Sequence, residues 1–239
     1  MIKKEYDISV VITCYNEART IKESIESALN QKVDCDFEVV VVDDKSKDSG
    51  PSIVKEMMRD YDNLTFVQHH RNLGHAYAGN VGVAASKGKY IVRLDGDDIF
   101  LPGILHSLWE KKCDERADIV IGDYTKKYIQ TGVVEVIRVS EEIIPTLVMC
   151  GNLVSKEAFY KAGGIKQILF EEYDLYMRLK KGYKWAYTHA PLYEYRQYGN
   201  SMCNQPDYWK KGTIELLKFW DKKTLAANGF EKLLELAEE

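Results

Sequence analysis

Hydrophobic residues in the first half of the chain alternate between two spacings. Short, continuous apolar runs are typical of buried strands in a parallel sheet, whereas apolar positions that recur every three or four residues are typical of the helices that cover it. The runs that predict strands are residues 8–13, 37–42, 64–68, 90–94 and 119–122. The helical spacing lies at residues 21–29, 53–58 and 75–85, and another helix is expected to start near Pro102. Strands that alternate with helices predict an α/β fold with a mostly parallel sheet.

The pattern changes after Asp123. Residues 124–139 alternate in the manner of a hairpin with its turn at Gly132, and residues 183–198 predict two more strands broken near Pro191. Helices are predicted between them, at residues 156–162 and 172–181. No internal repeat, low-complexity segment or linker interrupts the chain. We therefore expect one domain with two lobes, the first α/β and the second mixed.

Length and charge limit the class of protein. A chain of 239 residues, with 45% hydrophobic and 29% charged residues, suits one fairly large domain with a buried core. The net charge of -4 gives no basic field of the kind that nucleic-acid-binding proteins use, so any phosphate site must be local. The five cysteines include no C-x-x-C pair, which argues against a zinc site and a secreted disulfide framework.

The N-terminal apolar run is interpreted as a first strand and not as a signal peptide. No run reaches the roughly 18 apolar residues of a membrane span. A cytoplasmic protein is therefore expected.

Polar residues follow several of the predicted strands. Thr13 ends the first strand, Asp44 follows the second, and Asp95 and Asp97 follow the fourth. Because ligands of open α/β sheets bind beyond the carboxyl ends of the strands, we expect these side chains to surround a site. If the extended geometry persists through Gly96, Asp95 and Asp97 project to one face and require a cation.

Two common phosphate motifs are missing. No G-x-G-x-x-G follows the first strand, and no G-x-x-x-x-G-K-[ST] occurs anywhere. A Mg²⁺ or Mn²⁺ ion held by the acidic run from Asp95 to Asp97 could bridge diphosphate oxygens instead. The alternative is a solvated acidic turn that caps the following helix.

Five segments, in order, carry a resemblance to a known family. They are VVITCYNE, VVVDDKSKDSG, NLGHAYAGNVGVAASKGKYIVRLDGDD, FEEYDLYMRL and PLYEYRQYGNS, between about Ser9 and Ser201. Together they resemble the family-2 nucleotide-sugar glycosyltransferases, which are inverting enzymes of the GT-A fold. The resemblance implies a Rossmann-like three-layer α/β/α sandwich with a mostly parallel, mixed sheet. Together with the change of pattern after Asp123, it predicts one domain at residues 1–206, with a nucleotide-binding half at about 1–123 and an acceptor-binding half at about 124–206. A C-terminal helical extension is expected at 207–239.

The resemblance also implies roles for individual residues. Thr13, Tyr15 and Glu17 would contact the base and ribose, and Asp44 would hold the edge of the base. Asp95 would meet the nucleotide and, with Asp97, bind Mn²⁺ or Mg²⁺. The full set of expected nucleotide-binding residues is Thr13, Tyr15, Glu17, Asp44, Asn72, Gly74, Asp95 and Arg196.

The chain departs from the family pattern in its glycine-rich helix. The family often has an arginine before the asparagine of this helix, whereas this chain has Gly79 before Asn80. A contact to the diphosphate is therefore missing or supplied elsewhere. Arg196 falls where the family has a late arginine near the diphosphate, and the alternative is an arginine on the surface of a strand.

The expected general base differs in type. The family places it as the Asp of a Glu-Asp pair that opens a helix, and here the pair is Glu171-Glu172. Glu172 therefore stands at the position of the base, and a helix N-terminus favours its charged form. Asp174 is the rival catalytic candidate, although its spacing to Arg178 predicts an ion pair on the helix.

These features predict a metal-dependent inverting glycosyltransferase. It would move one sugar from a nucleotide-diphosphate sugar, most commonly UDP-linked, to a saccharide or glycoconjugate acceptor hydroxyl in polysaccharide or glycoconjugate synthesis. A module that binds nucleotide sugars without catalysis is the alternative, because Glu172 replaces Asp. A nucleotidyltransferase would need a glycine-rich loop after the first strand, which is missing.

The C-terminal segment lies beyond the resemblance. Residues 208–236 predict two helices broken near Asn228 and Gly229, with aromatic residues and lysines interleaved. These helices either pack on the second lobe or form an interfacial surface for peripheral contact with an anionic membrane.

Overall fold

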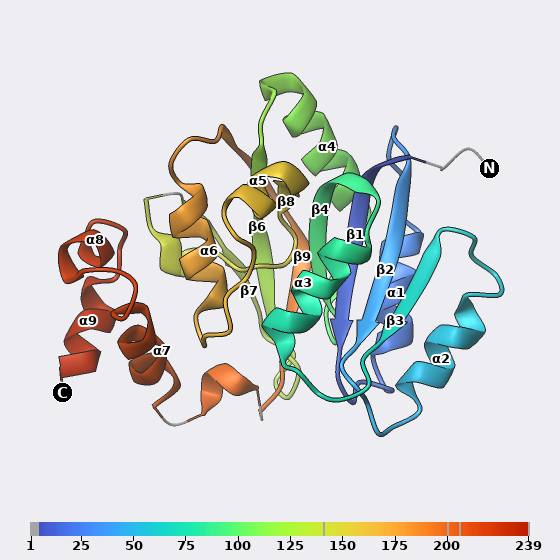
Figure 1. Cartoon of the computed structure of the whole chain (residues 1–239), viewed down its shortest axis with the longest axis horizontal. Coiled ribbons are helices and arrows are strands. Elements are labelled where there is room, and N and C mark those ends of the chain that lie inside the picture. The colour runs from blue at the N-terminus through green and yellow to red at the C-terminus, as the bar shows by residue number, and fades with distance from the viewer. Residues whose placement is uncertain (1–4, 141, 200, 206, 239) are drawn as a thin grey trace.

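The computed structural model describes residues 5–140, 142–199, 201–205 and 207–238. Its first half is a parallel sheet in the order β3-β2-β1-β4 (Figure 1). Helices cover both faces of this sheet, and the predicted apolar runs are accordingly buried on both sides of each central strand. The strands are β1 (Tyr6–Cys14), β2 (Phe37–Asp43), β3 (Leu64–Gln68) and β4 (Gly88–Asp95).

The second half continues the same sheet with mixed directions. Beyond β4 the order is β8-β6-β9-β5, in which β8 runs antiparallel to β4 and β6, and β9 runs parallel to β6. The predicted hairpin is confirmed, because β7 pairs antiparallel with β6 and Gly132 adopts a φ of 71° between them. The strands are β5 (Ile99–Phe100), β6 (Ile119–Tyr128), β7 (Val134–Ile137), β8 (Leu153–Ser155) and β9 (Trp185–Gln197).

Six helices of the described part surround the sheet. Figure 1 shows α3 and α5 in front of the sheet and α1 behind β1 and β2, which gives the three layers expected. The glycines of α3 have a packing role, because a Cβ atom at Gly82 would overlap the side chain of Val11 on β1. The helices are α1 (Ile21–Leu29), α2 (Gly50–Met57), α3 (His75–Ala85), α4 (Ile104–Glu115), α5 (Lys156–Lys161) and α6 (Glu171–Leu179).

The prediction of two strands at residues 183–198 is wrong, because β9 is one strand that includes Pro191. Its pairing with β6 is interrupted where Gly122 faces Thr188 and Tyr124 faces Tyr193, so a bulge accommodates the proline. The strand survives because β6 holds it on both sides of the bulge.

The C-terminal segment forms three helices and not the two predicted. They are α7 (Tyr208–Leu216), α8 (Lys222–Ala226) and α9 (Glu231–Glu238). Asp221 starts α8 as its cap, since its side chain accepts a hydrogen bond from the backbone N–H of Thr224 at 2.9 Å. The predicted break near Asn228 separates α8 from α9, where Gly229 has a φ of 88°. The expected domain boundary at residue 206 lies outside the described residues, as does the motif residue Asn200.

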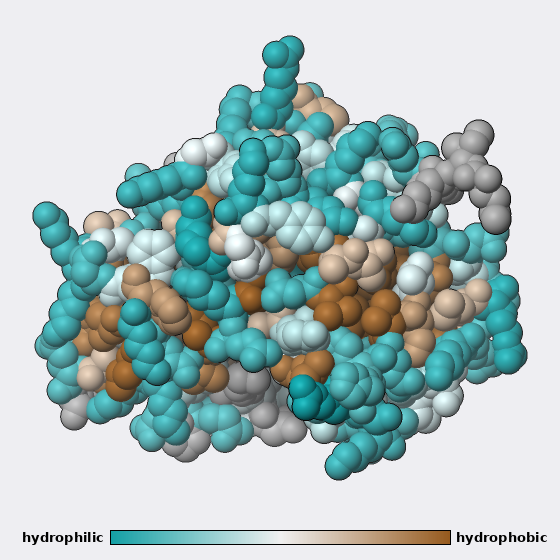
Figure 2. Space-filling model, in the orientation of Figure 1, coloured by the Kyte–Doolittle hydropathy of each residue, from teal (hydrophilic) through white to brown (hydrophobic). Residues whose placement is uncertain are grey.

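The C-terminal segment packs against the start of α6. Gly212 of α7 lies against the ring of Phe170, and the rings of Phe230 and Tyr173 are 5.6 Å apart. Figure 2 nevertheless shows apolar side chains among hydrophilic ones over the C-terminal helices, and Ile214 and Phe219 are among the exposed ones. No helix of the described part is long and apolar enough to cross a membrane.

Candidate active site

The carboxyl ends of the central strands meet at one edge of the sheet, as predicted. Thr13 on β1 pairs with Asp95 on β4, and Cys14 pairs with Asp43 on β2. Thr13 also donates a hydrogen bond from its hydroxyl to Oδ1 of Asp95 at 3.2 Å. This edge therefore brings the polar ends of three strands together.

The acidic run from Asp95 is a turn and not an extended segment. Strand β4 ends at Asp95, and the backbone N–H of Asp98 bonds the Asp95 carbonyl at 3.1 Å. The extended geometry expected through Gly96 is thus absent. Asp97 is half-buried on this turn, and desolvation followed by the charge of Asp95 raises its pKa to about 6. No described side chain donates a hydrogen bond to the Asp97 carboxylate.

Asp98, the third acid of the run, has a structural role. It is fully buried and accepts hydrogen bonds from the Tyr193 hydroxyl and from the backbone N–H of Arg196, the latter at 2.7 Å. Both partners lie on β9. Asp98 therefore ties the acidic turn to the second half of the sheet.

Glu17 lies over the same turn. A Cβ atom at Gly96 would overlap Oε2 of Glu17, so the glycine leaves the room that this carboxylate fills. Within the described part, Oε2 is buried without a hydrogen-bond partner. Desolvation, followed by the charges of Asp97 and Asp95, raises the pKa of Glu17 to about 9. Burial beside two other carboxyl groups thus favours the protonated form of Glu17 in the absence of a cation.

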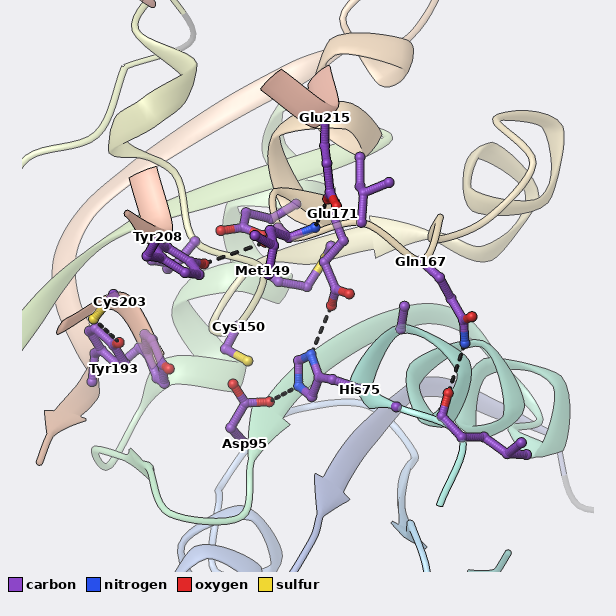
Figure 3. A pocket seen from close by; sticks show the side chains of 18 residues that line it. His75, Asp95, Met149, Cys150, Gln167, Glu171, Tyr193, Cys203, Tyr208 and Glu215 are labelled. Carbon is purple, nitrogen blue, oxygen red and sulfur yellow. Dashed lines mark hydrogen bonds and ion pairs between the residues drawn. The ribbon is translucent and has the colours of Figure 1, made fainter. Parts of the chain in front are cut away.

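A ring of alternating charges links Asp95 to helix α6. Nε2 of His75 lies 2.9 Å from Oδ1 of Asp95, and its Nδ1 lies 2.8 Å from Oε1 of Glu171 (Figure 3). Arg93 closes the ring from behind, with nitrogens 3.4 Å from Asp95 and 3.6 Å from Glu171. Strand β4, helix α3 and helix α6 are therefore joined through two cations and two carboxylates.

The two carboxylates Asp95 and Glu171 favour the protonated form of His75. Desolvation disfavours the positive charge of the imidazole, and so does Arg93, whose Nη2 lies 2.8 Å from Nε2 of the histidine. Asp95 and Glu171 outweigh both effects and raise the pKa of His75 to about 10. In the opposite direction, His75 and Arg93 overcome desolvation and hold the pKa of Asp95 well below its usual range. The side chain of His75 is 44% exposed and faces the cavity.

Arg93 is the most unexpected member of the ring. Its side chain is only 3% exposed, and Nε and Nη1 have no hydrogen-bond partner among the described residues. The guanidinium occupies the space beside Gly79, where a Cβ atom would lie 3.1 Å from Nη1. The side chain of Arg93 on β4 thus occupies space that a side chain at Gly79 of helix α3 would otherwise take.

Sequence reasoning did not identify His75, Arg93 or Glu171 as site residues. The available signal was a charged residue inside the apolar run of residues 90–94, because an arginine in a buried strand needs anionic partners. Those partners are distant in sequence, which the run alone does not reveal.

Glu172 lines a cavity of about 520 Å³ together with Asp95, His75 and Glu171. Desolvation, followed by the charge of Glu171, raises the pKa of Glu172 to about 8. The helix N-terminus was expected to favour the charged form, but burial beside a second carboxylate outweighs it. Glu172 nevertheless lines the same cavity as Asp95 at the end of β4.

Asp174 points away from this cavity. It is fully buried and accepts hydrogen bonds from Arg178 at 2.7 Å, from Lys166 at 3.1 Å and from the indole N–H of Trp220 at 3.0 Å. The predicted ion pair with Arg178 forms, but it is buried and does not lie on the helix surface as expected. Asp174 joins α6 to the C-terminal helices, and it is not among the residues that line the cavity.

Asp44 is buried beneath the start of α3. Its carboxylate accepts hydrogen bonds from the backbone N–H groups of Leu73 at 2.8 Å and Gly74 at 2.7 Å, and lies 2.7 Å from Nδ1 of His69. Gly74, with a φ of 91°, lines the cavity. Of the other expected nucleotide contacts, Tyr15 is 41% exposed and Asn72 is also exposed.

Arg196 is held by two carboxylates. It bonds both oxygens of Glu23 on α1 at 2.7 and 2.9 Å, and Oε1 of Glu194 at 2.8 Å. Its charge is close enough to lower the pKa of Asp97, against the larger effects that raise it. The expected arginine therefore lies near the acidic turn while it clamps β9 to α1.

Within the described ranges, no group of three or more His, Cys, Asp or Glu side chains is arranged to hold a metal ion. The acidic turn nevertheless offers the ligand atoms that a hard cation prefers. Asp97 and Glu17 both have carboxylate oxygens, and neither is paired with a cationic side chain in the described part of the chain.

Solved structures share this fold. A mannosyltransferase from Pyrobaculum calidifontis, PcManGT in complex with GDP-Man and Mn²⁺, aligns with a TM-score of 0.72 at 19% identity over 95% of this chain and 70% of that one. S. aureus TarS 1–349 in complex with UDP-GlcNAc gives a TM-score of 0.72 at 18% identity over 92% of this chain and 69% of that one. These similarities confirm the GT-A fold.

Sequence comparisons give the family. Glycosyltransferase GlyG of Streptococcus pneumoniae is 36% identical over 118 residues, which are 49% of this chain and 38% of that protein. An uncharacterized glycosyltransferase of Haemophilus influenzae is 28% identical over 193 residues, 72% of this chain and 61% of that protein. The chain thus spans little more than a third of the length of GlyG. The model of "Glycosyl transferase family 2" matches residues 9–170. Because this match covers more than half of the sequence, the chain belongs to glycosyl transferase family 2.

Proposed function

We propose that the protein is an inverting glycosyltransferase that moves one sugar from a nucleotide-diphosphate sugar to an acceptor hydroxyl. The observation that carries this proposal is the cavity that Glu172 of α6 and Asp95 at the end of β4 line together. A carboxyl group in the same cavity as the carboxyl end of the parallel sheet is placed to act as the base of an inverting displacement. The names of similar proteins support it, since TarS has been solved with UDP-GlcNAc and PcManGT with GDP-Man.

The donor would bind along the carboxyl edge of the sheet. Thr13, Tyr15 and Glu17 would contact the base and ribose, and Asp44 would hold the edge of the base while it orders the loop before α3. Asn72, Gly74 and Arg196 complete the proposed set. The exposed ring of Tyr15 offers a stacking surface for the base. A UDP-linked sugar is the donor that we propose to test first.

A divalent cation, Mn²⁺ or Mg²⁺, would be held by Asp97 with help from Asp95. The unpartnered oxygen of Glu17 and the raised pKa of Asp97 support a cation at this turn. The ion would neutralise charge that develops on the leaving diphosphate. Asp95 is less available than Asp97, because His75 and Arg93 already compensate its charge.

Glu172 would act as the general base. Its ionised carboxylate would accept the proton of the acceptor hydroxyl while the hydroxyl oxygen forms a bond to the anomeric carbon, and the bond to the diphosphate breaks on the opposite side. The raised pKa makes the ionised form a stronger base. The ion pairs that His75 and Arg93 make with Glu171 would hold this residue, and with it the start of α6, in position.

One observation favours a second candidate, a nucleotide-sugar-binding module without catalysis. With a pKa of about 8, Glu172 is mostly protonated at neutral pH in the absence of ligand, and a protonated carboxyl accepts no proton. Such a module would bind donor without hydrolysing or transferring it.

A thermal-shift series tests the proposal. We expect one of UDP, GDP, dTDP and CDP to raise the melting temperature, and Mn²⁺ to increase the shift, because a ligand that binds only the folded state stabilises it. The matching nucleotide sugar should then be hydrolysed slowly or transferred. The absence of any nucleotide shift would contradict both candidates, whereas binding without turnover over a broad acceptor panel would favour the binding module.

A further inference from the structure

The cavity beside Glu172 has a chemical character that bears on its acceptor. We propose that the acceptor is an uncharged saccharide, and that the cavity discriminates against acceptors that carry phosphate or carboxylate next to the reacting hydroxyl. This inference rests on the proposed function. Two features of the cavity lining support it: the charged side chains and the faces of the tyrosine rings. The family resemblance specifies neither feature.

Carboxyl side chains outnumber cationic side chains in the described lining of the cavity. Asp95, Glu171, Glu172 and Glu215 all line the cavity, and no lysine or arginine is among its described lining residues. The single histidine of the lining, His75, already shares its charge between Asp95 and Glu171. An anionic acceptor would therefore find no unpaired cationic side chain among the described lining residues.

The nearest arginine does not change this picture. Arg93 lies behind His75 and Asp95, its side chain is only 3% exposed, and it compensates the same two carboxylates. Lys166 likewise directs its amine to the buried Asp174 at 3.1 Å. Removing a phosphate from water without a new cationic partner is costly, so the cavity disfavours it.

Tyrosines give the cavity a second property. The hydroxyls of the three lining tyrosines have protein partners: Tyr193 bonds Asp98, Tyr195 lies 3.6 Å from Sγ of Cys203, and Tyr208 bonds the Leu169 carbonyl at 3.4 Å. What these side chains offer a ligand is therefore mainly ring carbon. Figure 3 shows Tyr193 and Tyr208 on the side of the cavity away from Gln167.

A neutral sugar matches both properties. Its C–H faces pack on aromatic rings, and its hydroxyls donate hydrogen bonds to carboxylates such as Glu172 and Glu215. Met149, Ile168 and Leu169 extend the apolar part of the wall. The lining thus accepts a ring with hydroxyl donors better than a group that brings acceptor oxygens and negative charge.

Matched acceptor pairs test this inference. With the nucleotide sugar identified by thermal shift, transfer is measured to p-nitrophenyl glucoside, galactoside and N-acetylglucosaminide and to their 6-phosphate or uronic acid counterparts. We expect kcat/KM to be at least about tenfold lower for each charged member, and the gap to shrink at high ionic strength because salt screens the repulsion.

A variant links the effect to the cavity. Glu215→Gln keeps an oxygen that can accept the hydrogen bond from the Leu169 N–H, which Glu215 accepts at 2.7 Å, and removes one negative charge. The substitution should lower the ratio of kcat/KM for the neutral acceptor to kcat/KM for its charged counterpart severalfold. Glu235→Gln, on the exposed surface of α9, is the matched control and should leave the ratio unchanged.

Each remaining outcome is decisive. Preference for a charged member, transfer to no neutral member, or a ratio that Glu215→Gln does not alter would overturn the inference. Donor binding and hydrolysis in those same samples would leave the proposed function standing, whereas a chain that binds no nucleotide would remove both.

Discussion

Nη1 of Arg93 lies 3.1 Å from the position that a Cβ atom would take on Gly79, so the arginine of strand β4 packs closely against helix α3 at a position without a side chain. The same guanidinium reaches Asp95 and Glu171. Gly79 therefore leaves room for the buried cation that joins the end of β4 to the start of α6.

Gly79→Ala should disturb this arrangement. The new methyl would press on Arg93 and on Cδ1 of Ile165, which would be 2.9 Å away, and overpacking of this kind costs about 1–3 kcal/mol. Urea denaturation should show that loss, with a fall in kcat as α6 shifts. Gly122→Ala is the control, because its new methyl would make ordinary contacts at 3.5 Å or more. Equal effects of the two substitutions would argue against the role of Gly79.

Glu172→Gln should separate the base from its rival. Loss of the proton-accepting group should lower kcat by roughly 10²–10⁴-fold with little change in donor affinity. Asp174→Asn should instead lower the free energy of unfolding by roughly 3–5 kcal/mol, because it breaks a buried ion pair. The assignment is wrong if Asp174→Asn, still folded, loses turnover and Glu172→Gln keeps it.

The raised pKa values make stability depend on pH. The folded protein holds protons on Glu17 to a pKa of about 9 and on Glu172 to about 8, both above the ordinary 4.5. Because the folded state then binds more protons than the unfolded state, the free energy of unfolding should fall as pH rises from about 4.5 towards 9. Denaturation at pH 5 and pH 8.5 measures the fall. Glu17→Gln and Glu172→Gln should each reduce it, and an unchanged fall in both would contradict the burial of these charges.

Asp97→Asn tests the cation. Loss of a charged ligand should abolish most transfer while the melting temperature stays near that of the wild type, because Asp97 is half-buried and has no side-chain donor in the described part. EDTA should have the same effect on the wild-type protein, and added Mn²⁺ should restore its activity. Full activity of the variant in chelator would refute the metal assignment.

The C-terminal helices are expected to be part of the core. Leu216, Leu225 and Phe230 are fully buried against the second half of the domain, so removal of residues 208–239 should lower stability markedly. We therefore expect no pelleting of the full chain with anionic vesicles at low or physiological salt. Salt-sensitive pelleting that Phe219→Ala weakens would instead support a membrane-binding surface, because Phe219 is exposed beside Lys218.

The sequence by itself determined the elements whose signal is local. Apolar runs predicted β1 to β4 and apolar positions at helical spacing predicted α1 to α3, because buried strands and helices each impose their own period on the chain. Strand ends then indicated Thr13, Asp44 and Asp95, since parallel strands that share a sheet end at the same edge.

Only the tertiary structure decided which charges meet. His75 and Glu171 are separated by 96 residues, and no local pattern specifies that α3 and α6 bring them to 2.8 Å. Likewise, Glu172 and Asp174 lie on one short helix, and packing alone shows that the first faces the cavity while the second is buried under Trp220. Such contacts depend on how distant elements pack, and the free energy that selects that packing is spread over the whole core, so no single segment of sequence records it.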